Sequence, residues 1–225
     1  MPLTTLEKRL LAHLPDIDPE KVGEVIGVGA QSVVRSYDAG GPEQVIKLPL
    51  FQSRRTLYAQ TVGRVIGQRH DRAKADLDTC AAYLERHMVP TRIVSDTRSG
   101  FFCVLQDRVR LQTITREVLA HSPPLDAQLG EIMEANRRMI AERGQWLDAM
   151  GWKLRKFVRF LARGEPYLEN VALDARSQTL RLFDFGLFPV PRRSRPPMRE
   201  YYRLLLAIQR RNMRGFGHAF APVGH

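Results

Sequence analysis

Two residues suited to binding a hard cation lie close together late in the chain, within the stretch YLENVALDARSQTLRLFDFGLF at 167–188. Asn170 offers an amide oxygen and Asp184 a carboxylate, and Mg²⁺ takes such oxygens together with phosphate oxygens. Between them, two apolar pieces at 171–173 and 180–183 flank a polar turn. That pattern predicts a short β-hairpin. Such a hairpin would hold Asn170 and Asp184 at one metal ion.

A glycine-rich stretch occurs near the start of the chain, where Gly27-Val28-Gly29-Ala30-Gln31-Ser32 separates two Val-rich pieces. Glycines let backbone amides approach phosphate oxygens, because no Cβ blocks the way. The stretch opens no helix and contains no Gly-Lys-Ser/Thr, which excludes a dinucleotide-binding fingerprint and a Walker loop. Taken alone, the pattern is more typical of a structural turn.

Lys47 ends the apolar run Val45-Ile46-Lys47. A lone buried ammonium group is costly, so this side chain must either leave the core or meet a negative partner. Phosphate oxygens beneath the glycine-rich hairpin would be such a partner. A lysine on an edge strand is the alternative.

The set of residues, taken in order, resembles the protein-kinase-like superfamily. Its glycine-rich loop, strand lysine, metal-binding asparagine and Asp-Phe-Gly motif match Gly27, Gly29, Ser32 in place of a third glycine, Val34, Lys47, Asn170 and Asp184–Gly186. These matches extend from about residue 22 to 188. The resemblance implies a kinase-like fold with ATP and Mg²⁺ as cofactors.

The resemblance also implies roles. The glycine-rich loop would cover the phosphates of ATP, Lys47 would contact the α- and β-phosphates, and Asn170 and Asp184 would hold Mg²⁺. Val34 would pack over the adenine. The segment 105–109 would form the hinge at the other edge of the adenine, with Gln106 among the nucleotide-binding residues.

The family pairs its strand lysine with a glutamate from the following helix. Here that helix offers Asp76 and Asp78, with Glu85 further along, and none is a clean match. Asp76 and Asp78 are the candidates.

Three departures from the family concern catalysis. Counting five residues back from the asparagine gives Glu165 where the family has an aspartate that accepts the proton of the attacking hydroxyl. Gly164 replaces the preceding arginine, and Tyr167 replaces a frequent lysine. After Gly186 only a Pro/Arg-rich stretch and about one helix remain. The chain therefore resembles a minimal, bacterial kinase-like protein, whose catalytic residues would be Glu165, Lys47 and Asp184.

The remaining pattern predicts an α+β, two-lobed protein-kinase-like fold with a small antiparallel-sheet N-lobe and an abbreviated helical C-lobe. We expect an N-terminal helical extension at 1–21, the N-lobe at 22–108, and the C-lobe with a basic C-terminal segment at 109–225. Within them, helices are expected at 3–14, at 56–88, at 125–150 with breaks at Gly130 and Gly144, and at about 198–213. Strands are expected to follow Val22 and Pro90.

Composition limits the partners. The 225 residues carry a net charge of +11, with arginine concentrated at 192–214. This segment predicts either a solvated helix face or a docking surface for a protein substrate or acidic partner. Nucleic acid is disfavoured, because aromatic residues are not interleaved with the charge.

No membrane span or signal peptide is visible, and two cysteines predict a reducing, cytoplasmic location. Delivery to another cell stays open.

Four functions are compatible with these observations. The first is an ATP-dependent phosphotransferase acting on protein Ser or Thr, and the second is a pseudokinase that binds nucleotide or a partner without transfer. A small-molecule kinase is third; its frequent preference for cationic substrates fits poorly with the basic late segment. The fourth is a basic interaction protein unrelated to kinases.

Overall fold

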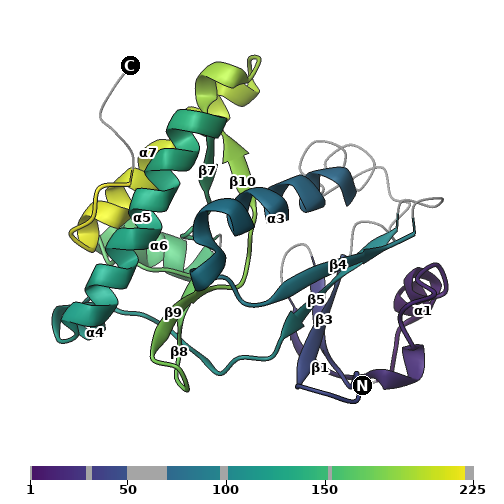
Figure 1. Ribbon diagram of the computed structural model, residues 1–225. Helices are drawn as coiled ribbons and strands as arrows, with labels where there is room; N and C mark the ends of the chain where they lie inside the picture. The colour runs from purple at the N-terminus through teal and green to yellow at the C-terminus, as the bar shows by residue number, and fades with distance from the viewer. Residues whose placement is uncertain (1, 29–31, 50–69, 97–100, 152–153, 221–225) are drawn as a thin grey trace. The chain divides into compact units, whose positions relative to one another are not determined.

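The computed structural model describes residues 2–28, 32–49, 70–96, 101–151 and 154–220, which form two compact units (Figure 1). The first unit comprises residues 1–75 and 89–108, and the second comprises 76–88 and 109–225. Residues 76–88 therefore group with the second unit, although the sequence pattern placed them in the first lobe. The predicted mixed α+β fold, with an antiparallel sheet first and helices later, is confirmed.

The first unit is built on an antiparallel sheet of order β1-β2-β3-β5-β4. Its strands are β1 (Val22–Val28), β2 (Ser32–Tyr37), β3 (Gln44–Pro49), β4 (Thr91–Ser95) and β5 (Phe102–Asp107). Their β-branched and aromatic residues favour a pleated, half-buried surface. The turn between β1 and β2 and the predicted helix from 56 to 69 lie outside the described residues.

One face of this sheet is covered by the N-terminal segment. Helix α1 (Thr5–Leu11) begins with a capping box in which Thr4 and Glu7 exchange hydrogen bonds, and a 3₁₀ turn η1 (Pro19–Lys21) leads into β1. Leu10, Leu11, Leu14 and Ile17 pack against side chains of the sheet, which are Val22, Tyr37, Ile46, Leu48, Val94, Cys103 and Leu105. Residues 1–21 are therefore part of the core of this unit.

That core contains one ion pair. The Arg35 guanidinium donates from Nε to Glu7 Oε1 at 2.7 Å and from Nη2 to Glu7 Oε2 at 3.0 Å. It also donates to the carbonyl oxygens of Gly23 and Pro2. Burial alone would raise the pKa of Glu7, but the hydrogen bonds from Arg35 and Thr4 outweigh burial and lower that pKa.

The second unit is mainly helical. Its helices are the later part of α3 (His70–Leu84), α4 (Arg116–Ala120), α5 (Pro123–Arg143), α6 (Leu154–Arg163) and α7 (Met198–Gly215), with 3₁₀ turns η3 (Glu85–His87) and η4 (Pro191–Arg193). Two small antiparallel sheets accompany them. One joins β6 (Leu111–Gln112), β8 (Val171–Asp174) and β9 (Thr179–Leu182), and the other pairs β7 (Gln145–Leu147) with β10 (Leu187–Pro189).

Two features of the second unit differ from the sequence prediction. The helical region expected at 125–150 continues unbroken through Gly130, where a break was expected, and ends at Arg143. The break expected at Gly144 is present, because Gly144 adopts a left-handed conformation (φ 63°) and caps the helix. The chain then continues as β7. Helix α6 was not predicted, whereas the last helix was expected at about 198–213 and is found as α7. Among the helices of the described residues, none has the length and apolar composition needed to cross a bilayer.

Candidate functional site

The β8–β9 hairpin brings Asn170 and Asp184 to the same end of the second unit. Val171 pairs with Leu182, and just beyond this pair the Phe183 amide donates to the Asn170 carbonyl oxygen at 3.2 Å. Asp184 is the next residue. The predicted hairpin is thus present, and it places an amide and a carboxylate on adjacent positions of paired strand ends.

A third residue, Asp148, meets Asn170 at this end. The Asn170 side chain donates from Nδ2 to the Asp148 carbonyl oxygen at 2.6 Å. The Asp148 amide in turn donates to the carbonyl oxygen of Gly186 at 3.2 Å, beside the β7–β10 pairing of Leu147 with Leu187. Because Nδ2 is engaged, Oδ1 is the Asn170 atom that can ligate a cation.

The Asp148 carboxylate is buried and held in place. Its Oδ1 accepts a hydrogen bond from the Gly151 amide at 2.9 Å and another from Gln209 Nε2 of α7 at 2.6 Å. Sequence analysis did not identify Asp148. A short apolar strand that ends in an aspartate, Gln145-Trp146-Leu147-Asp148, is the signal that could have indicated it.

At Gly151 the backbone comes very close to Glu169 and Asn170. Its φ is 63°, and a Cβ there would lie 2.8 Å from Glu169 Cβ and 3.1 Å from Asn170 Oδ1. We expect Gly151→Ala to lower the free energy of unfolding of the second unit by about 1–3 kcal/mol, through backbone strain and displacement of Asn170.

Urea unfolding followed by tryptophan fluorescence measures this effect, because Trp146 and Trp152 both belong to the second unit. Gly186→Ala is the control, since no atom lies within 4 Å of its Cβ position. Equal stability of the two variants would contradict the role assigned to Gly151.

Tyr167 is hydrogen-bonded both to α7 and to Gly151. Its backbone amide donates to Asn212 Oδ1 at 3.0 Å, and Asn212 Nδ2 donates back to its carbonyl oxygen at 2.8 Å. Its hydroxyl donates to the Gly151 carbonyl oxygen at 3.4 Å. Burial, then the charges of Asp148 and Glu169, raise the pKa of Tyr167, so the phenol stays a donor at neutral pH.

Glu165, predicted as the catalytic carboxylate, lies in a different setting. It is exposed and pairs with Arg163 at 3.6 Å. Within the described residues it makes no hydrogen bond to Asn170 or Asp148. Its catalytic role stays a prediction, and Asp148 is the carboxylate residue that the structure connects directly to Asn170.

Helix α3 contacts the Asp-Phe-Gly segment. Asp76, which is buried, accepts a hydrogen bond from the Leu187 amide at 3.4 Å, and the Cys80 thiol donates to the Phe185 carbonyl oxygen at 3.8 Å. Burial, then the charges of Asp76 and Asp184, raise the pKa of Cys80, so this thiol is not a nucleophile. Asp78 is exposed. Pairing of either aspartate with Lys47 stays a prediction.

In the first unit, the predicted phosphate-binding residues form a row across the sheet. Gly27 pairs with Val34, and Val34 pairs with Lys47 on β3. Directly opposed residues project to the same face, so Val34 and Lys47 share the face opposite Ile46 and Leu48 of the core. Ser32 begins β2, and Gly29 lies outside the described residues.

Gln106, predicted near the adenine, lies within β5 and is buried. Its side chain donates from Nε2 to Thr91 Oγ1 of β4 at 2.8 Å. This hydrogen bond ties the side chain into the sheet, so a nucleotide role for Gln106 depends on its backbone or on a rearrangement.

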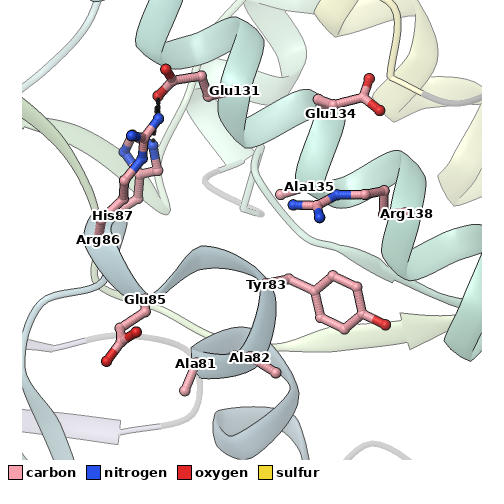
Figure 2. A pocket seen from close by; sticks show the side chains of 10 residues that line it. All are labelled: Ala81, Ala82, Tyr83, Glu85, Arg86, His87, Glu131, Glu134, Ala135 and Arg138. Carbon is pink, nitrogen blue, oxygen red and sulfur yellow. Dashed lines mark hydrogen bonds and ion pairs between the residues drawn. The ribbon is translucent and has the colours of Figure 1, made fainter.

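A pocket of about 410 Å³ lies between α3–η3 and α5 (Figure 2). Figure 2 shows Glu131 paired with Arg86, and His87 Nε2 also lies 3.2 Å from Glu131. The hydrogen bond from Arg86 lowers the pKa of Glu131. Glu85, considered above for Lys47, lines this pocket, but Asn170, Asp184 and Asp148 do not. Arg86 and His87 are paired with Glu131, and the Arg138 guanidinium lies over the Tyr83 ring, so we assign this pocket no ligand.

Solved structures similar to this chain include two from Mycobacterium tuberculosis. The sequence matches no protein-family model and no curated protein. The erythromycin complex of Rv3197 from Mycobacterium tuberculosis has a TM-score of 0.48 and 13% identity, covering 92% of this chain and 60% of that chain. The PknI kinase domain from the same organism has a TM-score of 0.43 and 15% identity, covering 90% and 77%.

The chain thus spans 60% of the length of the first of these structures. At such low identities and TM-scores, neither neighbour decides what this protein does. Its function has to be argued from its own residues.

Proposed function

We propose that this protein is an ATP- and Mg²⁺-dependent phosphotransferase that acts on Ser or Thr of a protein substrate. One observation carries the proposal: Asn170 is hydrogen-bonded to Asp148 and to the residue before Asp184, while Asp148 is hydrogen-bonded to Gly186. These hydrogen bonds support a site in which Asn170 and Asp184 supply oxygen ligands suited to Mg²⁺ close to Asp148. That grouping is the chemistry that phosphoryl transfer requires.

Each residue has a defined task. Backbone amides of the glycine-rich loop around Gly27 would bind phosphate oxygens, and Lys47 would neutralise the α- and β-phosphates. Asn170 Oδ1 and the Asp184 carboxylate would hold Mg²⁺, which supplies charge neutralisation at the γ-phosphoryl group. Val34, on the same face as Lys47, offers an apolar surface for the adenine.

Glu165 and Asp148 are the two candidates for the residue that orients the substrate hydroxyl and accepts its proton. Glu165 has the position expected from the sequence. Asp148 binds Asn170 through its main-chain carbonyl oxygen, and its carboxylate is fixed by the Gly151 amide and Gln209. We expect Asp148→Asn to lower the rate of transfer by about 10²–10⁴-fold, and Glu165→Gln to lower it less than about tenfold. The reason is that a proton acceptor must be fixed within hydrogen-bond reach, and Glu165 is exposed and paired with Arg163.

The measurement is transfer from γ-labelled ATP with Mg²⁺, to the protein itself and to proteins of a cell lysate. Thermal unfolding of each variant shows whether it is folded. A larger loss in Glu165→Gln than in folded Asp148→Asn would assign the role to Glu165 and contradict the role of Asp148.

A pseudokinase is the second candidate, favoured by the exposed, ion-paired state of Glu165. Equilibrium binding of Mg-ATP separates the two functions. Binding with no transfer by the wild type under any condition would support the pseudokinase. No binding at all would overturn the phosphotransferase and a nucleotide-binding pseudokinase.

A further inference from the structure

Helix α6 has an apolar side that its own packing covers only in part. Phe160 is buried against Met150 and Tyr167, and Phe157 is partly buried beside them. Val158 and Leu161, which are neighbours at i and i+3, are 53% and 48% exposed. Exposed aliphatic side chains of this size form a strip along the outer surface of α6.

The polar side of α6 is entirely cationic. Arg155, Arg159 and Arg163 follow one another at i+4 spacing, and α6 contains no acidic residue. Arg155 and Arg159 form no ion pair within the part of the chain that the structure describes. Lys156 pairs with Glu169, which ties α6 to the residue before Asn170.

Helix α7 packs against α6. Ile208 packs against the Phe160 cluster, and the Arg211 guanidinium lies 5.3 Å from the centre of the Phe160 ring. Tyr201 and Leu204 lie on the same stripe of α7 as Ile208, seven and four residues before it, and Leu204 is 60% exposed. Of eight large apolar side chains that are exposed among the described residues, four belong to α6 and α7.

The charge of the protein is concentrated in α6, in α7 and in the segment that leads into α7. Residues 154–163 and 191–215 contain twelve Arg or Lys and one Glu, a formal charge of +11. The whole chain has 35 basic and 24 acidic residues, also +11, so the other 190 residues balance at 23 of each. We call the exposed surface of α6 and α7 the α6–α7 face.

The chemistry of this face selects its partner. A nucleic acid offers phosphates but no aliphatic surface to meet Val158, Leu161 and Leu204. An acidic protein would need carboxylates and apolar side chains at matching positions. An anionic bilayer presents phosphates and hydrocarbon together along its whole interface, and it attracts helices with Arg on one side and Leu, Val or Phe on the other.

We propose that the α6–α7 face docks the protein on membranes rich in anionic phospholipids, as a peripheral contact. Arginine side chains bind the lipid phosphates, and the exposed aliphatic strip enters the boundary between headgroups and acyl chains. This contact is independent of phosphoryl transfer, and α6 lies between Asp148 and Asn170 in the chain.

Co-sedimentation with vesicles tests the proposal. The protein is expected to bind vesicles of phosphatidylcholine and phosphatidylglycerol and not to bind vesicles of phosphatidylcholine alone. It should dissociate from the anionic vesicles as the salt concentration is raised. Arg155→Ala with Arg159→Ala should weaken binding by about 25-fold, at about fivefold for each arginine. Val158→Ser with Leu161→Ser should weaken it by about tenfold or more, with the charge unchanged.

The matched control is Lys8→Ala with Arg9→Ala, which removes two exposed charges from α1 in the other unit and should change binding by less than about threefold. The Asp184→Asn protein should bind vesicles like wild type, so failure here and failure of the proposed activity are distinguishable. Absence of vesicle binding at low salt would overturn the proposal. So would an equal loss in the control, or binding to RNA or polyglutamate that exceeds vesicle binding and survives Val158→Ser with Leu161→Ser.

Discussion

Replacing Asp184 with Asn is expected to lower Mg-ATP-dependent phosphoryl transfer by about 10²–10³-fold. The substitution keeps the shape of the side chain but removes the negative charge that would hold Mg²⁺ against Asn170 Oδ1. It should leave the fold intact, because the contacts that hold this segment are made by the neighbouring residues. The Phe183 amide donates to Asn170, the Phe185 carbonyl oxygen accepts from Cys80, and the Leu187 amide donates to Asp76.

Asp174 provides a matched control in the same hairpin. Its carboxylate accepts from Ser177 Oγ at the turn between β8 and β9, and this hydrogen bond lowers the pKa of Asp174. Asp174→Asn should therefore affect the stability of the hairpin and leave transfer within a few-fold of wild type. Steady-state transfer and Mg²⁺ titrations of both variants separate a metal role from a structural one. Normal transfer by folded Asp184→Asn would refute the phosphotransferase.

Sequence analysis found the site residues that lie on consecutive, paired strands. A hairpin between Asn170 and Asp184 follows from apolar pieces around a polar turn, and it closes over a short separation. The Gly27, Val34 and Lys47 row likewise follows from consecutive strands that pair in order. Nearest-neighbour hairpins need no knowledge of distant contacts.

Asp148 could not be found by that route. It stands 22 residues before Asn170, with α6 between them, and it reaches the site through β7–β10 pairing and the Asn170 side chain. Helix α6 ends at Arg163, before Glu165, so a count of the family's spacing back from Asn170 stays within one loop and leads to Glu165. Asp148 lies before α6 in the chain, and only the tertiary structure shows its contact with Asn170.

The N-terminal segment shows a similar limit. A leucine pattern at 3–14 correctly predicted a helix, but sequence alone classed residues 1–21 as an extension. The buried contact between Glu7 and Arg35, 28 residues apart, makes this helix part of the sheet's core. Neither an arginine within a Val-rich strand nor a glutamate in an amphipathic helix indicates its partner.

This buried pair leads to the second large expected effect. Glu7→Gln should destabilise the first unit by about 3 kcal/mol, because it removes the carboxylate charge that faces the buried Arg35 guanidinium. The side chains of Glu7 and Arg35 are 6% and 2% exposed, so water cannot replace the lost carboxylate. Glu43→Gln is the control: its pair with Arg108 is exposed, at 3.7 Å, and its loss should cost less than about 1 kcal/mol.

The same pair predicts a pH dependence. The pKa of Glu7 in the folded state is lowered from its ordinary value of 4.5, so its contribution to stability is complete above that value. It is lost as pH falls through the lower, folded-state pKa. Wild type should therefore lose stability of the first unit below about pH 4.5, and Glu7→Gln should lack this part of the acid dependence.

The readout has to report on the first unit alone. Because Trp146 and Trp152 both belong to the second unit, tryptophan fluorescence does not report unfolding of the first unit. Hydrogen exchange of the amides in β2 and β3 does report it. Protection of these amides from exchange should fall in Glu7→Gln, while protection of the amides in α5 should stay unchanged. If Glu7→Gln matched Glu43→Gln in protection and kept the wild-type acid dependence, the helix would be an appendage of this unit rather than part of its core.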